Sequence, residues 1–370
     1  MSSTAPTVVT TTDDPAVAPP RGDGAPGRRE GRVAVGLERR AVLRALAVAV
    51  VILVAGLFVP DLITSSYYMG VAADGVVLGI MAAGIGFLAH RSGLISLGHT
   101  AFYGGSAYGV AIFTTHWGWS PTTAAVVAVI GGTLLAVAIG SLVIRITGFG
   151  FLMLTLAFGQ ALYALSTLTS LRDVTGAFDG ISVVFSGESQ KVAGLTQAQL
   201  GAPDTFWPLA WVCLVLVVLG LWLVGRSRFG VTLEAIRENE ERARFSGYNT
   251  YLPRLGAFAI SGFCASIAGV LFALKASYVS PDVLGFQLAG DSLVATIVGG
   301  FTILIGPVVG ALLYIYAQGR FGDTGNLELY MGLALIVVVI FLPGGVVGFV
   351  TDRVVRLRAR LWRGRKGAGS

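Results

Sequence analysis

Long apolar runs, separated by short polar stretches, recur along most of the chain. A helix needs about 20 apolar residues to cross the roughly 30 Å hydrocarbon core of a membrane, because it rises 1.5 Å per residue. The strands of a membrane barrel would alternate polar and apolar residues, which these runs do not. The pattern predicts an all-α, polytopic membrane protein with about 8 to 10 transmembrane helices. The predicted segments cover residues 42–59, 67–89, 98–116, 121–146, 149–169, 206–225, 255–277, 291–304, 306–318 and 329–350.

Two stretches fit a simple crossing poorly. Segment 98–116 is interrupted by glycines, and the apolar stretch 291–318 is too long for one crossing and too short for two. Such pieces are often half-helices or re-entrant hairpins, which are tolerated where they are buried against protein or line a cavity. We therefore expect broken or re-entrant segments at both places.

The composition separates a membrane domain from two polar ends. Hydrophobic residues make up 54% of the chain and charged residues only 12%, against about 25% charged residues in soluble domains. Residues 1–41 are rich in Pro, Ser, Thr, Ala and Arg and show no apolar period, which predicts a disordered cytoplasmic tail. This tail is too long and polar for a signal-peptide n-region, so we expect the first apolar run to remain as an anchor. The membrane domain is predicted over 42–350, followed by a basic cytoplasmic tail over 351–370.

The positions of Lys and Arg predict the orientation, because basic residues accumulate on the cytoplasmic side of membrane proteins. Seven basic residues lie in 1–44, six in 226–254 and seven in 351–370. An even number of crossings that starts inside places all three stretches in the cytoplasm. The basic tail also suits contact with anionic lipid, and its lack of interleaved aromatic residues gives no support to nucleic-acid binding.

The longest predicted inner loop, residues 226–254, is the most densely charged stretch outside the tails. Its sequence predicts a short surface helix that Thr232 caps and that Gly247 or Asn249 ends in a left-handed turn. Glu238–Arg242 and Glu240–Arg244 are i,i+4 pairs. An apolar stripe is formed by Leu233, Ile236 and Ala243. The loop reads either as a docking helix for a cytoplasmic partner or as an ordinary solvated helix.

Several polar residues inside the predicted spans are candidates for a solute pathway. Ser96 and His99 lie where an inner loop turns into the glycine-broken segment, and Thr155 and Gln160 lie within the fifth segment. Ser292, like Ser96, precedes a leucine and, further on, a pair of glycines, which weakly suggests an internal repeat facing the same path. For each of these residues, packing or a backbone hydrogen bond is the alternative interpretation.

A resemblance to a known family follows from motifs that recur in order over about 67–350. They are Gly93-Leu-Ile-Ser-Leu-Gly-His-Thr-Ala-Phe102, Leu156-Ala-Phe-Gly-Gln160, Glu234-Ala-Ile-Arg-Glu-Asn-Glu240 with Gly247-Tyr-Asn249, Ala257-Phe-Ala-Ile-Ser261, Ala268-Gly269, Ser280-Pro281, Gly299-Gly300, Gly306-Pro-Val-Val-Gly-Ala311 and Phe341-Leu-Pro-Gly-Gly-Val-Val-Gly348. The chain resembles the permease subunits of ATP-binding-cassette (ABC) importers, in particular the branched-chain amino-acid permeases of the LivM type.

The resemblance implies an ABC importer permease fold in a bacterial inner membrane. It further implies two separate ATPase subunits, a second homologous permease and an extracytoplasmic substrate-binding protein as partners. The ATPases would dock on the 226–254 loop. The residues that the resemblance assigns to this coupling are Glu234, Ala235, Ile236, Arg237, Glu238, Gly247 and Asn249.

The chain itself lacks a nucleotide site of the Walker type. A GxxxxGK[ST] loop needs a lysine followed by Ser or Thr, whereas Lys191, Lys275 and Lys366 precede Val, Ala and Gly. The scattered histidines, the two separate cysteines and the lack of paired carboxylates in the spans argue against an enzyme, a metal site or a cofactor. Asp74 is the best acidic candidate for an ion pathway, although a carboxylate at headgroup level is the simpler interpretation.

Two departures from the family pattern leave the substrate open. Leu94 stands where the family usually has Gln, and Thr175-Gly-Ala177 stands where it usually has Thr-Gly-Gly. Urea and short-amide permeases are close relatives that carry Leu at the first position. The prediction is therefore a permease for branched-chain or related amino acids. The alternatives are a urea or short-amide permease, or an ion-coupled secondary transporter that works alone.

Overall fold

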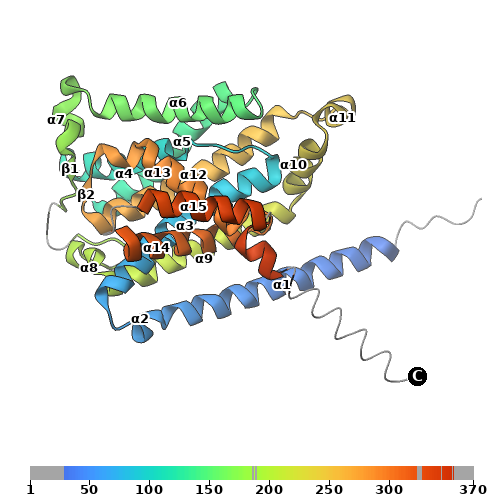
Figure 1. Ribbon diagram of the computed structural model, residues 1–370, viewed down its shortest axis with the longest axis horizontal. Coiled ribbons are helices and arrows are strands. Elements are labelled where there is room, and N and C mark those ends of the chain that lie inside the picture. Colours follow the sequence, from blue (N-terminus) through green and yellow to red (C-terminus); the bar gives the residue numbers. More distant parts are fainter. Residues whose placement is uncertain are drawn as a thin grey trace, which may run out of the picture. The chain divides into compact units, whose positions relative to one another are not determined.

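The computed structural model describes residues 29–185, 187, 190–322, 327–342, 344–351 and 353 (Figure 1). The chain divides into two units, residues 1–44 and 45–370. The predicted disorder of residues 1–28 and most of the predicted basic tail lie outside the described residues. Helix α1, Arg29–Leu57, begins well before the predicted tail boundary at residue 41. Residues 29–41 are mostly good helix formers, so they extend the helix that the apolar run starts.

Each of the ten predicted apolar segments forms a helix. The long helices are α1, α3 (Ser66–Ser92), α5 (Pro121–Val143), α6 (Phe149–Ser166), α9 (Pro203–Arg226) and α12 (Tyr251–Ala276). Among the described residues, these six are long and apolar enough to cross a membrane. The shorter apolar helices are α4 (His99–Thr115), α13 (Phe286–Gly299), α14 (Gly306–Phe321) and α15 (Leu327–Phe341). The predicted segment 329–350 is interrupted after Phe341, and residues 345–351 form a further helix.

Helices α3, α4 and α12 form the centre of the bundle, because glycines let their backbones approach closely. A side chain on Gly84 of α3 would meet the backbone oxygen of Ser261 in α12, and one on Gly269 of α12 would meet the backbone oxygen of Tyr103 in α4. Helix α5 packs on α4 and α12, whereas α9 and α14 pack on α3. Close backbone contacts at glycines therefore add to the packing of large buried side chains such as Phe87, Phe102 and Phe258 at the centre.

Helices α13 and α14 form a hairpin, as the alternative prediction for 291–318 allowed. They have 14 and 16 residues, which is short of the length of about 20 needed for a full crossing. Gly299 packs directly against the backbone of Gly306, and Gly345, with a φ of +73°, packs against Gly300. The glycine motifs of three separate segments thus meet at the turn of this hairpin.

The two ends of the bundle carry different short elements (Figure 1). One end holds α10 (Arg228–Glu238) and α11 (Glu240–Phe245). The other end holds η1 (Thr169–Leu171), α7 (Arg172–Thr175), η2 (Ala177–Asp179), β1 (Ile181–Ser182), α8 (Gln197–Gly201), β2 (Tyr278–Val279) and η3 (Pro281–Leu284). Strands β1 and β2 are antiparallel, with Ile181 opposite Val279. The short α2 (Val59–Leu62) joins α1 to α3. We call these the α10–α11 end and the β1–β2 end.

Candidate functional site

The charged loop forms two helices instead of the single predicted one. The backbone is extended at Asn239, with φ −159° and ψ 101°, and this residue separates α10 from α11. The Asn239 side chain accepts a hydrogen bond of 2.8 Å from the backbone N–H of Arg242, so it caps α11. The acidic residues Glu240 and Glu241 follow in the first turn of α11, where the helix dipole favours them. The break removes the predicted i,i+4 relation between Glu238 and Arg242.

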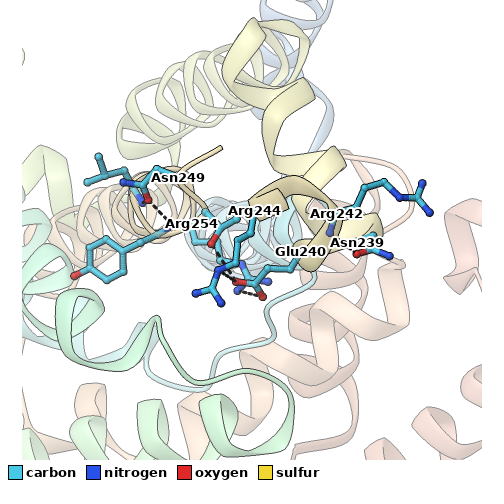
Figure 2. Close-up of polar contacts among 9 residues, drawn as sticks. Asn239, Glu240, Arg242, Arg244, Asn249 and Arg254 are labelled. Carbon is cyan, nitrogen blue, oxygen red and sulfur yellow. Dashed lines mark hydrogen bonds and ion pairs between the residues drawn. The ribbon is translucent and has the colours of Figure 1, made fainter. Parts of the chain in front are cut away.

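The predicted ends of the loop helix are partly wrong. Helix α10 begins at Arg228, and Thr232 lies inside it, where its hydroxyl donates to the backbone oxygen of Arg228 at 2.9 Å. Gly247 has a φ of +82° just beyond α11, which confirms the left-handed turn. The Asn249 side chain accepts from the backbone N–H of Tyr251 at 3.0 Å (Figure 2), so it serves the start of α12 instead of the end of α11.

Helix α10 is attached to the ends of α3 and α9. Its apolar residues Leu233 and Ile236 are buried, as the predicted stripe requires. Arg91, in the last turn of α3, forms an ion pair with Glu234, with 3.0 Å between Nη1 and Oε2. The Arg237 guanidinium donates to the backbone oxygen of His90. Glu234 and Arg237, predicted to face a partner, therefore also hold α10 to the bundle.

Helix α11 is attached to α12 through Glu240 (Figure 2). One carboxylate oxygen of Glu240 lies 2.7 Å from Arg254 Nη1, and the other accepts from the Thr250 hydroxyl at 3.1 Å. The predicted partner Arg244 lies further away, at 4.0 Å, and is mostly exposed. Arg254 is only 8% exposed. The buried Arg254 is therefore the main partner of Glu240, which the i,i+4 spacing could not reveal.

The outward surface of the two helices carries apolar groups. Phe245 is 91% exposed, and Val231 and Tyr248 are also largely exposed. A hollow of about 250 Å³ lies between α10 and α11. It is lined by Val231, Thr232, Ala235, Ile236, Glu238, Asn239, Arg242, Ala243, Ser246 and Tyr248. Of the predicted coupling residues, Ile236 is buried, whereas Glu234, Ala235, Arg237, Glu238, Gly247 and Asn249 are exposed.

His99 is held inside the bundle. Its Nε2 lies 2.5 Å from the hydroxyl of Ser261 in α12, so two motifs that are far apart in sequence meet here. The ring packs edge-on against Phe102 and Phe258. His99 therefore links α4 to α12.

The start of α4 also packs closely against α6. Thr155 of α6 accepts a hydrogen bond of 3.3 Å from the backbone N–H of Leu97, and the hydroxyl of Ser96 accepts one from Gly98 at 3.1 Å. Thr100 Oγ1 would lie 3.5 Å from a side-chain carbon placed on Gly159 of α6.

Several buried polar atoms on these helices make no hydrogen bond within the described residues. They include Thr100 Oγ1 of α4 and Gln160 Nε2 of α6. The fifth pathway candidate, Ser292, is buried in α13, where its hydroxyl donates to Ala289 of the same helix. The structure thus brings Ser96, His99 and Thr155 into one region, while Ser292 makes hydrogen bonds within α13.

The β1–β2 end holds an ion pair that the sequence did not reveal. Asp74 of α3 lies 2.5 Å from Lys275 of α12, and the same ammonium group donates to the backbone oxygen of Gly70 at 3.1 Å. Two charges within apolar runs favour pairing over separate burial. That rule was a usable signal, although it could not single out a partner 201 residues away.

Comparisons with known proteins show which family the chain belongs to. The family model described as branched-chain amino acid transport system / permease component matches residues 67–342. The chain is 28% identical to the high-affinity branched-chain amino acid transport system permease protein LivM of Escherichia coli, over 72% of this chain and 66% of that protein. The LivM protein of Salmonella typhimurium is 27% identical over the same shares.

A third relative matches a smaller part of the chain. It is the autoinducer 2 import system permease protein LsrC of Salmonella paratyphi B, 32% identical over 38% of this chain and 42% of that protein. No solved structure matches the chain significantly. The chain spans 66% of the length of the LivM relatives, and the family match covers most of its described helices. The chain belongs to the family of permease components of branched-chain amino acid transport systems, the ABC permeases of the LivM type.

Proposed function

We propose that this chain is the membrane-spanning subunit of an ABC importer, driven by separate ATPase subunits that dock on α10 and α11. Two ATPases, a second permease and an extracytoplasmic binding protein complete the assembly. The α10–α11 end faces the cytoplasm, with both chain termini on the same side, because the basic residues concentrate there. The family membership and the LivM relatives support this assembly.

The observation that carries the proposal is the surface of α10 and α11. Apolar side chains such as Phe245 and Tyr248 are exposed here, beside a hollow and several charged groups. Exposed aromatic residues next to a cavity are typical of a protein interface. The same helices are tied by ion pairs to α3 and α12, so a partner that binds here acts on the transmembrane helices.

The solute is proposed to be a branched-chain or related amino acid, since the LivM relatives are named as branched-chain amino acid permeases. We place its path along the contact of α4 and α6, near Ser96, His99, Thr155 and Gln160, with Ser292 on α13 nearby in the path. The buried unpaired atoms of Thr100 and Gln160 support this placement. A buried polar atom without a hydrogen bond costs about 1–3 kcal/mol. Opening of the contact between α4 and α6 would let water or solute form hydrogen bonds with these atoms.

A co-purification experiment tests the docking surface. The tagged chain is expressed with the ATPase subunits encoded by neighbouring genes, and the bound ATPase is quantified. Phe245→Asp should reduce bound ATPase by about tenfold or more, as loss of a central interface residue does. Phe178→Asp is the matched control, because Phe178 is 73% exposed at the β1–β2 end. Equal ATPase recovery with both variants would overturn the docking assignment.

Uptake by proteoliposomes tests the class and the solute. The complete complex should take up leucine, isoleucine or valine only with ATP inside the vesicles. Gln160→Leu should change the KM for the solute, whereas Gln318→Leu, an exposed glutamine of α14, should not. Uptake by this chain alone on an ion gradient would instead identify a secondary transporter. Uptake of urea in place of amino acids would correct the substrate.

A further inference from the structure

We infer that the 226–254 loop consists of two separate levers that meet at Asn239: α10 moves with α3 through Arg91, and α11 moves with α12 through Arg254. The inference rests on the proposed docking of ATPases and assigns roles to two residues that do not belong to the docking surface. Arg91 and Arg254 are positioning residues, which determine where a force applied to the loop is transmitted.

Arg91 joins three elements at one point. Its guanidinium pairs with Glu234 of α10, 143 residues further along the chain. It also lies against the end of α9, since a side-chain carbon on Gly225 would be 3.0 Å from Arg91 Nη2. The Arg237 bond to His90 adds a second link between α10 and α3. Without these two links, α10 would be connected to α3 mainly by apolar packing of its buried stripe.

Arg254 has the corresponding role for α11. Glu240 uses one carboxylate oxygen for Arg254 and the other for Thr250, so the first turn of α11 is bound to the first turn of α12. Arg254 is buried, and a buried, hydrogen-bonded charge pair is costly to break. Helix α11 and the start of α12 therefore form one unit.

The junction between the two levers is weak. The extended backbone at Asn239 interrupts the helical hydrogen bonds, and no ion pair joins α10 to α11 within the described part of the chain. The hollow lies across this junction and is lined from both sides, by Ala235 and Glu238 of α10 and by Arg242 of α11. An ATPase segment seated in the hollow contacts both levers and changes the angle between them.

Contacts at the β1–β2 end determine how α3 and α12 move when the angle between α10 and α11 changes. Asp74 and Lys275 hold α3 to α12 at the β1–β2 end. When α10 draws α3 and α11 draws α12, the two helices therefore separate at the α10–α11 end and pivot about the Asp74–Lys275 pair. Such a movement is a hinge motion in which rigid elements turn about a few fixed contacts.

The test measures the number of solute molecules transported per ATP hydrolysed by the complete complex in proteoliposomes. Arg91→Ala should leave the ATPases bound and hydrolysing ATP, while the transport ratio falls by roughly tenfold, within the range of usual coupling free energies. The charge exchange Arg91→Glu with Glu234→Arg should restore most of the ratio. A merely structural role would lower the amount of complex and both activities together, without changing the ratio.

A matched control comes from the opposite end. Arg172 and Asp179 form an exposed pair of 2.6 Å only seven residues apart, so Arg172→Ala should leave the ratio unchanged. Arg91→Lys, which keeps the charge, should give an intermediate ratio and serves as the second variant if Arg91→Ala does not fold. An unchanged ratio in the folded Arg91 variants, or a charge exchange that restores nothing, would overturn the lever inference. The Phe245→Asp experiment tests docking separately, because it measures the amount of bound ATPase and not the solute transported per ATP.

Discussion

Helix α3 is held by an ion pair at each of its ends, and the two pairs differ in what they connect. At the β1–β2 end, Asp74 pairs with Lys275 of another long helix, at 2.5 Å. At the α10–α11 end, Arg91 pairs with Glu234 of a short surface helix, at 3.0 Å. Each pair has one mostly buried and one more exposed member: Lys275 is 14% and Asp74 47% exposed in the first pair, and Arg91 is 22% and Glu234 55% exposed in the second. The first pair joins two parts of the bundle, and the second joins the bundle to a surface that a partner can reach.

The difference assigns separate tasks to the two pairs. The Asp74–Lys275 pair joins two long helices of the bundle, so breaking it removes a link between them and costs stability. The Arg91–Glu234 pair joins the bundle to a short surface helix and contributes little to stability, typically about 0–1 kcal/mol. The role of this pair is to link α10 to α3, so that α3 moves when α10 moves. We therefore expect variants at the first pair to change folding and variants at the second to change coupling.

The largest effect is expected at Lys275. Lys275→Met keeps the apolar stem but leaves Asp74 unpaired about two turns inside α3. Because Asp74 is 47% exposed, the cost should stay below the roughly 2.5–3.5 kcal/mol of a charge at the centre of a membrane helix, at about 2 kcal/mol. The thermal unfolding temperature of the purified chain should therefore fall. Lys191→Met is the control, because Lys191 is exposed in the loop at the same end.

A double-mutant cycle separates the pair from other losses at this position. Asp74→Asn combined with Lys275→Met removes both charges, and should be more stable than Lys275→Met alone. If the double variant is as unstable as the sum of the two single variants, Asp74 and Lys275 do not stabilise one another, and the proposed pivot has no fixed point.

A smaller effect is expected at the α10–α11 end, from Arg254. Arg254→Ala leaves the partly buried Glu240 with only Thr250 and the distant Arg244, and should cost about 1–2 kcal/mol, because the site is open to water on one side. Arg244→Ala removes an exposed arginine 4.0 Å from the same carboxylate and should cost about 0.5 kcal/mol or less. Hydrogen exchange of the amides in 240–245 should be faster in the first variant only. Equal exchange in both would contradict the attachment of α11 to α12.

The helices of this fold could be predicted because their signal is local. The length and composition of each apolar run can be read from the local sequence, without knowledge of the segments that pack against it. The hairpin of α13 and α14 was allowed by the same argument, since neither half is long enough to cross. Short connections within the loop were harder, because the i,i+4 charges favoured one helix across Asn239. Asn followed by Glu240 and Glu241 was a usable capping signal for the break.

The contacts of the candidate site could not be predicted in the same way. The motif with His99 and the motif with Ser261 were both recognised, but their hydrogen bond joins residues 162 positions apart. The Arg91–Glu234 and Asp74–Lys275 pairs are similarly distant. A single sequence gives no pairing rule over such separations, because the order in which helices pack determines which charges meet. The charges themselves were visible, and their partners were not.

The smallest effect concerns two alanines in the left-handed region, both at the β1–β2 end. Ala177 has a φ of 48°, and the exposed Ala193 has a φ of 49°. This backbone costs an alanine about 1–2 kcal/mol, whereas glycine adopts it freely but loses about 0.4–1 kcal/mol through the entropy of the unfolded chain. Ala193→Gly should therefore raise the free energy of unfolding by about 0.5 kcal/mol.

Ala177→Gly should gain less than Ala193→Gly, because the Ala177 methyl group is buried and its removal costs about 0.8 kcal/mol. Ala198→Gly is the control: Ala198 is an exposed residue inside α8, so the change relieves no strain and should only lower stability. Thermal unfolding of the three variants in one detergent should rank them Ala193→Gly, Ala177→Gly and Ala198→Gly. None of these changes at the β1–β2 end should alter the number of solute molecules transported per ATP. Within the described residues, no ion pair links this loop to α10 or α11. A change in that ratio with Ala177→Gly would show that the β1–β2 end also takes part in coupling.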